Sequence, residues 1–180
     1  MITVTAPEHP WLRITERAWE NPVDPTFAQR HGGRWNPPNS WPTVYLNADV
    51  ATARANVHRF AARWPYEVED LRPDAGPDLV EALLPTRQRV LDVDSVEGVA
   101  SVGLPRSYPV DSGGEVVAHE PCRRIGRRAR NAGLMGVYCR SAAIADGTGR
   151  ELAWFPNGQH AVVRTRTPFA EWFHAQAPPA

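Results

Sequence analysis

Apolar residues recur with helical spacing in the region that follows residue 49. Asp49 stands where a helix N-cap is expected, and Pro65 marks the point where the pattern stops. The spacing predicts an amphipathic helix that buries one stripe of side chains, with Asn56 at the edge of that stripe. The apolar positions, three, four or seven residues apart, are Val50, Ala53, Val57, Phe60, Ala61 and Trp64.

A second helix is predicted over residues 121–130, with Cys122, Ile125 and Ala129 turned inward and Gly133 ending it. Residues 97–115 are predicted to be a loop, and residues 168–173 a closing helical turn. Short strands interleaved with a few helices, without regular βαβ alternation, predict an α+β domain. The expected strands are residues 11–15, 44–46, 79–84, 89–93, 136–139, 152–155 and 161–165.

Composition narrows the classes of function. The 180 residues show no break in composition, which indicates one domain that can bury its core without disulfides or metals. The formal net charge is zero, so the molecule as a whole has no electrostatic reason to bind nucleic acid or an anionic membrane. All 20 basic residues are arginine, a bias typical of a GC-rich genome, and no lysine is present to form a Schiff base.

The two cysteines, Cys122 and Cys139, have no partner Cys or His at a metal-binding spacing, so neither a zinc site nor a disulfide scaffold is predicted. The first residues have neither a basic start nor a long apolar run, and no later segment approaches the length of a transmembrane helix. We therefore expect a soluble cytoplasmic protein. Export by a machine that reads no amino-terminal signal stays open.

Candidate chemistry begins with the segment Gly32-Gly33-Arg34-Trp35-Asn36-Pro37-Pro38. Two glycines let the backbone bend sharply and approach a ligand, and the Arg34 guanidinium offers a planar fork of donors suited to phosphate or carboxylate. His31, directly before the glycines, would hydrogen-bond a phosphate when protonated. On this segment alone, a tight turn with an ordinary surface arginine is the simpler interpretation.

Further motifs follow at matching distances. The order of Arg13, Gly33-Arg34-Trp35-Asn36, Tyr45-Leu46, an alanine-rich helix and Gly136-Val137-Tyr138-Cys139-Arg140-Ser141 resembles the RES domain, a family named after an arginine, a glutamate and a serine. The resemblance covers about residues 11–173 and implies one RES-like domain over residues 1–180. It implies an ADP-ribosyltransferase-like α+β fold of mixed sheets with a few flanking helices. It also implies a toxin of a bacterial toxin–antitoxin pair that consumes NAD.

The resemblance implies roles for individual residues. Arg34 corresponds to the family arginine and would hold the NAD pyrophosphate, with Gly33 and Arg13 beside it. Tyr45 corresponds to an aromatic residue whose ring would stack on nicotinamide, and Ser141 to the serine, which would shape the pocket without attacking. Simpler interpretations stay open: a solvated arginine at position 13, a core tyrosine at 45, and a turn-capping serine at 141.

The glutamate of the family does not appear, because its position falls on Asn56. Cleavage of the nicotinamide–ribose bond places positive charge on the ribose, which a carboxylate can counter and an amide cannot. Losing one such contact typically costs about 3 to 4 kcal/mol. Two hypotheses follow: an NAD-cleaving enzyme, by hydrolysis or ADP-ribosyl transfer, or an impaired relative that binds a nucleotide or a protein partner without turnover.

Other acids are candidates to replace the missing glutamate, namely Glu67, Glu69, Asp146 and Glu151. Glu151 is the most interesting because its strand should return to the pocket near Ser141, although a glutamate at a strand end is usually solvated.

The predicted second helix carries a dense cluster of positive charge. It could bind an acidic partner such as an antitoxin, or phosphates, although a solvated helix face is the simpler interpretation and we do not expect nucleic acid. The RES resemblance implies an antitoxin that blocks the pocket, often with a homodimeric toxin. The cluster consists of Arg123, Arg124, Arg127, Arg128 and Arg130.

Overall fold

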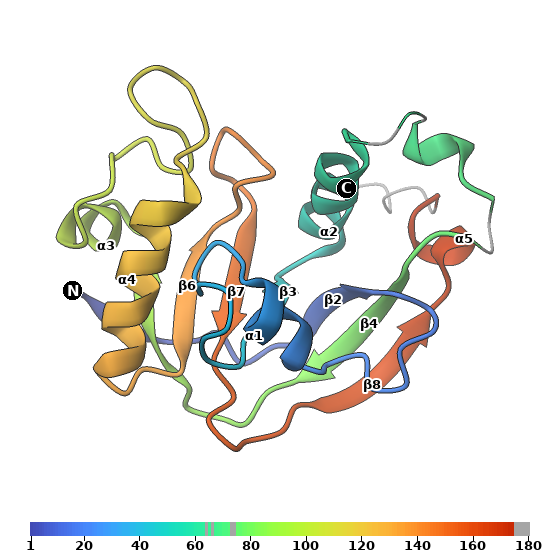
Figure 1. The fold of residues 1–180 in the computed structure, drawn as a ribbon, viewed down its shortest axis with the longest axis horizontal. Helices are drawn as coiled ribbons and strands as arrows, with labels where there is room; N and C mark the ends of the chain where they lie inside the picture. Colours follow the sequence, from blue (N-terminus) through green and yellow to red (C-terminus); the bar gives the residue numbers. More distant parts are fainter. Residues whose placement is uncertain (64, 66, 73–74, 175–180) are drawn as a thin grey trace.

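The computed structural model describes residues 1–63, 65, 67–72 and 75–174, and their strands form one mixed sheet (Figure 1). The strand order is β1-β5-β6-β7-β3-β2-β4-β8, and neighbours are antiparallel except for the parallel pair β5 and β6. With its flanking helices, this sheet confirms the expected α+β fold. The strands are β1 (Thr3–Thr5), β2 (Trp11–Thr15), β3 (Val44–Asn47), β4 (Asp78–Leu83), β5 (Arg89–Val93), β6 (Gly136–Arg140), β7 (Arg150–Trp154) and β8 (Val162–Thr167).

Both helices predicted from periodicity are present. The side chain of Asp49 caps the first, α2 (Val50–Ala61), by accepting a hydrogen bond from the Thr52 amide at 2.7 Å. In the second, α4 (His119–Asn131), the inward-facing Cys122, Ile125 and Ala129 are buried as expected.

One prediction for α2 is wrong, because Phe60 is 59% exposed. The buried row of α2 is Ala53, Val57 and Ala61, each four residues after the last, and Phe60 lies in the final turn beside that row. Trp64 and the side chain of Glu69 lie outside the described residues.

Most of the shorter helical segments in the described residues were not predicted, because a segment of three to six residues is too short to display helical periodicity. The region expected to be a loop contains most of α3 (Val96–Ser101), which starts where the Ser95 hydroxyl accepts a hydrogen bond from the Gly98 amide at 2.9 Å. The closing turn is confirmed as α5 (Phe169–Trp172). The remaining segments are α1 (Thr26–His31) and the 3-10 helix η1 (Val68–Asp70).

Two hydrophobic cores lie side by side on one face of the sheet. In the first, α3 and α4 pack on β5, β6 and β7, and in the second, α2 and α5 pack on β2 and β4 (Figure 1). A third cluster, which includes Trp11, Leu46 and Leu152, covers the opposite face. The line where the first two cores meet is called the seam below, and it runs along β3 and β7.

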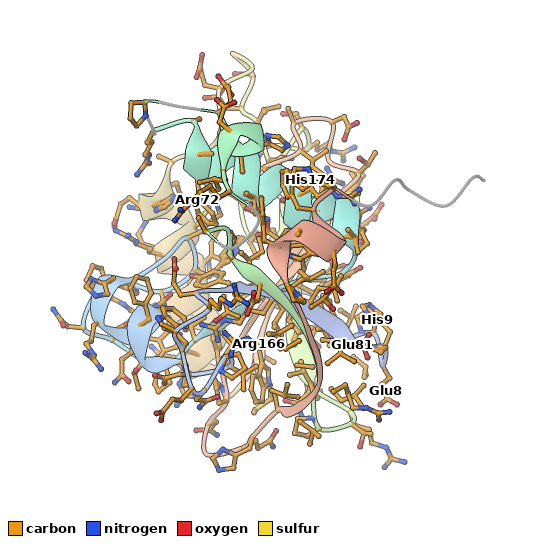
Figure 2. All side chains as sticks on the ribbon, turned by 90° about the vertical axis from the view of Figure 1, so that its right-hand side faces the viewer. Glu8, His9, Arg72, Glu81, Arg166 and His174 are labelled. Atoms are coloured by element: carbon orange, nitrogen blue, oxygen red, sulfur yellow. The ribbon has the colours of Figure 1, made fainter. Side chains whose placement is uncertain are left out.

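The edge of the sheet at β8 is tied to the loop after β2. Arg166 of β8, labelled in Figure 2, forms an ion pair with Asp78 at 2.7 Å. It also donates hydrogen bonds to the carbonyl groups of Glu16, Arg17 and Trp19. These contacts hold the loop over residues 16–19 against the sheet.

Among the helices of the described residues, none has the length and apolar character needed to cross a bilayer. Cys122 and Cys139 are both buried and free.

Candidate functional site

Strand alternation brings four polar side chains to the seam. Asn47 of β3 lies directly opposite Glu151 of β7, and Tyr45, two residues earlier, is on the same face. Cys139 of β6 pairs with Glu151 from the other side, and Ser141 follows two residues later. Tyr45, Asn47, Ser141 and Glu151 therefore share the face of the sheet that α2 and α4 cover.

The centre of the site is a hydrogen-bonded cluster around Glu151. Its Oε1 atom accepts a hydrogen bond from Asn56 Nδ2 at 2.6 Å and another from Ser141 Oγ at 2.5 Å. Asn56 Nδ2 also lies 2.9 Å from Asn47 Oδ1, and Asn47 in turn donates to the carbonyl of Leu12 at 3.2 Å. Side chains from β3, from α2 and from the residue after β6 are thus gathered around one carboxylate of β7.

A polar stripe of α2 faces this cluster. Thr52, Asn56 and Arg59 follow one another at spacings of four and three residues, so they share one side of the helix, next to the buried row. Arg59 is half-buried and makes no hydrogen bond or ion pair with any residue that the structure describes. Its pKa is lowered by burial and then by the positive charge of Arg34, while the negative charge of Glu151 opposes the shift. Arg59 therefore lies within electrostatic reach of both Arg34 and Glu151.

Arg34 is held in the first core with only 7% of its surface exposed. Its Nη1 donates to the carbonyl of Val117 at 2.6 Å and contacts Cys122 Sγ at 3.7 Å. The other guanidinium nitrogens donate no hydrogen bond within the described part of the chain, and they are not among the buried atoms that lack a partner. They therefore keep some contact with solvent, which leaves donors available for an anion.

Tyr45 is fastened to the glycine–arginine loop. Its hydroxyl accepts a hydrogen bond from the Trp35 amide at 2.9 Å and donates to Asn36 Oδ1 at 2.7 Å. The ring lies so close to Gly33 that a Cβ there would be 2.3 Å from the hydroxyl oxygen, so only glycine fits. Burial raises the pKa of Tyr45, so the phenol stays protonated at neutral pH and does not serve as a base.

The amino-terminal part of α4 adds positive charge beside Arg34. Arg123 Nε donates to the carbonyl of Gly33 at 3.0 Å. The pKa of His119 is lowered to about 4 by partial burial and then by the neighbouring cations, so this ring is neutral at pH 7. The cations that lower it are Arg34, Arg123, Arg59 and Arg63.

The rest of the arginine cluster on α4 points elsewhere. Arg124 pairs with Glu120 on the surface at 3.3 Å, Arg130 donates to Asn157, and Arg127 and Arg128 are exposed. Within the described residues, Arg123 is the only one of the five that forms a hydrogen bond with the glycine–arginine loop. The solvated helix face considered from the sequence thus describes most of this cluster.

Arg13 does not join the site cluster. It alternates along β2 with Leu12 and Ile14, which pack toward α2, so Arg13 points to the opposite face of the sheet. There its Nη2 donates to the carbonyl of Asp24 at 3.1 Å, and its guanidinium lies 5.7 Å from the centre of the Trp19 ring. Burial lowers its pKa to about 10, which leaves it charged at neutral pH.

Among the acids considered whose side chains the structure describes, only Glu151 forms hydrogen bonds with Asn56 and Ser141. Asp146 accepts hydrogen bonds from Thr148 in an exposed turn, and Glu67 is exposed. Asn47 went unnoticed in the sequence, although its place two residues after Tyr45 on a strand was a usable signal.

Two cavities, of about 240 and 460 Å³, lie away from the cluster, the second around Trp19 and Asp24. Within the described residues, no three or more His, Cys, Asp or Glu side chains are grouped so as to hold a metal ion.

The structure thus defines an α+β domain with arginines and a carboxylate cluster along the seam between two helix-covered cores. The RES domain family matches residues 10–175, and the chain therefore belongs to the RES domain family. This confirms the resemblance drawn from the sequence. No curated protein sequence matches the chain. A chain in the crystal structure of the M. tuberculosis MbcT-MbcA toxin-antitoxin complex is similar in fold, with a TM-score of 0.75 and 22% identity over 96% of this chain and 92% of that one.

Proposed function

We propose that this RES domain is a toxin that cleaves NAD at the bond between nicotinamide and ribose, by hydrolysis or by transfer of the ADP-ribosyl group. The observation that carries the proposal is the seam itself. At the seam, the guanidinium groups of Arg34 and Arg59 have N–H donors that make no hydrogen bond within the described residues. Beside them, small polar side chains surround Glu151. A dinucleotide requires this combination, because its diphosphate is anionic and its ribose hydroxyls need hydrogen-bond partners.

The proposed reaction separates charge along the seam. The bond between C1′ of the ribose and the pyridinium nitrogen breaks, its electron pair neutralises the nicotinamide, and the ribose is left with oxocarbenium character. Water or another acceptor then bonds to C1′ and releases a proton. Arg34 and Arg59 would hold the diphosphate, the ring of Tyr45 would face the nicotinamide, and Ser141 would bind the ribose. Its hydroxyl already donates to Glu151, and no histidine contacts it within the described residues, so we assign it no nucleophilic role.

Asn56 favours a second candidate function. If a carboxylate at position 56 were indispensable, this chain would bind NAD or another nucleotide without turning it over. An impaired protein of this kind would regain activity when a carboxylate is introduced at position 56.

A single assay separates the two functions. Purified protein is mixed with NAD, and nicotinamide release is followed for the parent, for Arg34→Ala and for Asn56→Glu. As a matched control, Arg127→Ala removes an exposed arginine from α4. Turnover by the parent and by the control, with loss in Arg34→Ala, is the expected result. If the parent releases no nicotinamide and Asn56→Glu does, the second function replaces the first. If neither the parent nor any variant binds NAD, both functions are refuted.

An antitoxin is the proposed partner. The similar structure named above is a toxin-antitoxin complex, and for this chain we infer a protein that covers the seam and blocks access to it. Homodimerisation of the toxin stays a prediction from the resemblance. Copurification of the chain with the product of a neighbouring gene, and loss of nicotinamide release in that complex, would test the antitoxin proposal.

A further inference from the structure

We propose that Glu151 is the catalytic carboxylate of this chain: it supplies from β7 the negative charge that stabilises the ribosyl cation, and Asn56 positions it. The proposal rests on the proposed cleavage of NAD and names the group that carries it out. It follows from how the two oxygens of Glu151 are used.

One oxygen of Glu151 is fixed and the other is open. Oε1 accepts both hydrogen bonds of the cluster, from Asn56 at 2.6 Å and from Ser141 at 2.5 Å. Oε2 makes no hydrogen bond or ion pair with any residue that the structure describes, and it is not among the buried atoms that lack a partner. The carboxylate is therefore held in one orientation while its second oxygen remains available to a ligand.

Structural carboxylates of the same chain are used differently. Asp92, which also lies within a strand, accepts from the Asp94 and Ser95 amides with Oδ1 and from the Ser95 hydroxyl with Oδ2. Asp78 forms an ion pair with Arg166 at 2.7 Å. Glu151 has neither a second set of donors nor a directly paired cation among the described residues, although it is half-buried.

The amide at position 56 complements a carboxylate at position 151. An ionised carboxylate only accepts hydrogen bonds, so the NH2 group of Asn56 must face Glu151, and its contacts with Asn47 Oδ1 and Thr52 O are also made as a donor. A carboxylate at position 56 could not donate these bonds, and it would bring two negative charges into contact. Asn56 is thus the residue type that a functional Glu151 requires beside it.

The charge of Glu151 is not cancelled locally. Arg59 is near enough for the charge of Glu151 to oppose the lowering of the Arg59 pKa by burial, yet the two form no ion pair. With the diphosphate bound by the arginines, Glu151 would be the negative group nearest to its own cluster of ribose-binding side chains, Asn56 and Ser141. When the glycosidic bond breaks, the positive charge that develops on the ribose would be countered by this carboxylate, a contact that strengthens in the transition state.

The test is Glu151→Gln, which keeps an oxygen to accept the bonds from Asn56 and Ser141 but removes the charge. We expect kcat for nicotinamide release to fall by about 100-fold or more, because a transition-state contact is lost. The thermal midpoint and the Kd for NAD, measured by calorimetry, should stay close to those of the parent. Glu97→Gln, an exposed glutamate in the first turn of α3, is the matched control and should leave all three quantities unchanged.

A charge exchange across the contact provides a second measurement. The double variant Asn56→Asp with Glu151→Gln keeps one carboxylate and one amide in the pair, with the charge moved by one hydrogen bond. It should recover a substantial part of the kcat lost in Glu151→Gln, which a purely structural role of Glu151 would not produce.

The outcomes separate this proposal from the proposed function. If the parent releases nicotinamide and Glu151→Gln does so within about twofold of it, Glu151 is not the catalytic carboxylate, while NAD cleavage stands. If Glu151→Gln lowers the thermal midpoint and weakens NAD binding as well as lowering kcat, and the double variant recovers none of the lost kcat, Glu151 is structural. The proposal is then overturned. A silent parent that gains activity through Asn56→Glu overturns the proposed function and this inference together.

Discussion

The two ends of the candidate site are built in different ways. The arginine end is locked by the backbone: Arg34 donates to the carbonyl of Val117, the Tyr45 hydroxyl bonds to the Trp35 amide, and a Cβ at Gly126 of α4 would lie 1.8 Å from the Trp35 carbonyl oxygen. The carboxylate end is centred on contacts between side chains, from Asn56 and Ser141 to Glu151, although Asn47, Asn56 and Ser141 each also bond to one backbone group.

Because the two ends are built differently, substitutions at each end should have different effects on stability and on activity. At the arginine end, a changed side chain leaves buried backbone groups unpaired or forces a helix to move, so the residue types are dictated by packing. At the carboxylate end, position 56 of α2 and position 151 of β7 are in contact, so a carboxylate at either position would place its negative charge at nearly the same point. We therefore expect substitutions at the arginine end to lower stability and activity together, and those at the carboxylate end to change activity with little loss of stability.

The largest effect should come from Gly126→Val, which acts on the arginine end through α4. The added side chain meets the carbonyl of Trp35, so α4 must move away from the loop that carries Arg34. We expect the free energy of unfolding, measured by urea denaturation, to fall by about 3 kcal/mol. Arg127→Ala on the exposed side of the same helix should change it by less than about 0.5 kcal/mol. Equal stability of the two variants would show that α4 and the loop are not in such close contact.

Arg34→Lys should have the next largest effect. The ammonium keeps a positive charge but cannot reach Val117, Cys122 and an anion with one planar fork. We expect kcat/KM for nicotinamide release to fall by about 100-fold, with a measurable drop in the thermal midpoint. A lysine variant with parental kcat/KM would reduce the role of Arg34 to that of a point charge.

Removing one hydroxyl at each end compares the ends directly. Tyr45→Phe leaves both the Trp35 amide and Asn36 Oδ1 without their partner, and it should lower the free energy of unfolding by about 1 to 3 kcal/mol. Ser141→Ala leaves Glu151 still bonded to Asn56 and takes the acceptor away from the amide of half-buried Ala143, and it should cost about 1 kcal/mol. Differential scanning calorimetry of both variants measures this contrast, and a larger loss in Ser141→Ala would reverse the assignment of the rigid end.

The smallest expected effect concerns pH, because His119 is exposed and solvent screens the charges around it. The pKa of His119 is lowered to about 4 in the folded chain, whereas it lies near 6.5 in an unfolded one, so between these values the unfolded state binds more protons. The stability of the parent should therefore fall as the pH decreases from about 6.5 toward 4. His119→Gln should show a shallower decline in urea denaturation over this range, and parallel curves for the two proteins would contradict the assigned pKa.

Periodicity was sufficient to predict α2, α4 and the core strands, because each is long enough to repeat a buried position. It failed for α3, which depends on a single cap at Ser95, and for Phe60, whose exposure depends on where the opposing core ends. In the site, Tyr45 and Ser141 came from the family resemblance. Asn56 and Glu151 are 95 positions apart in the sequence. They meet because β7 lies next to β3 in the sheet, and no local sequence pattern predicts this strand order.

The seam also has a mechanical consequence. On the face that the helices cover, the two halves of the molecule have separate cores, and Asn56 bonded to Glu151 is a direct side-chain link between the covering helix of one half and a strand of the other. A ligand bound at the seam would contact both halves, so its binding should raise the thermal midpoint of unfolding. A ligand at one hundred times its Kd would add about 2.7 kcal/mol to the free energy of unfolding, and a protein inhibitor seated over the same joint would add its own share.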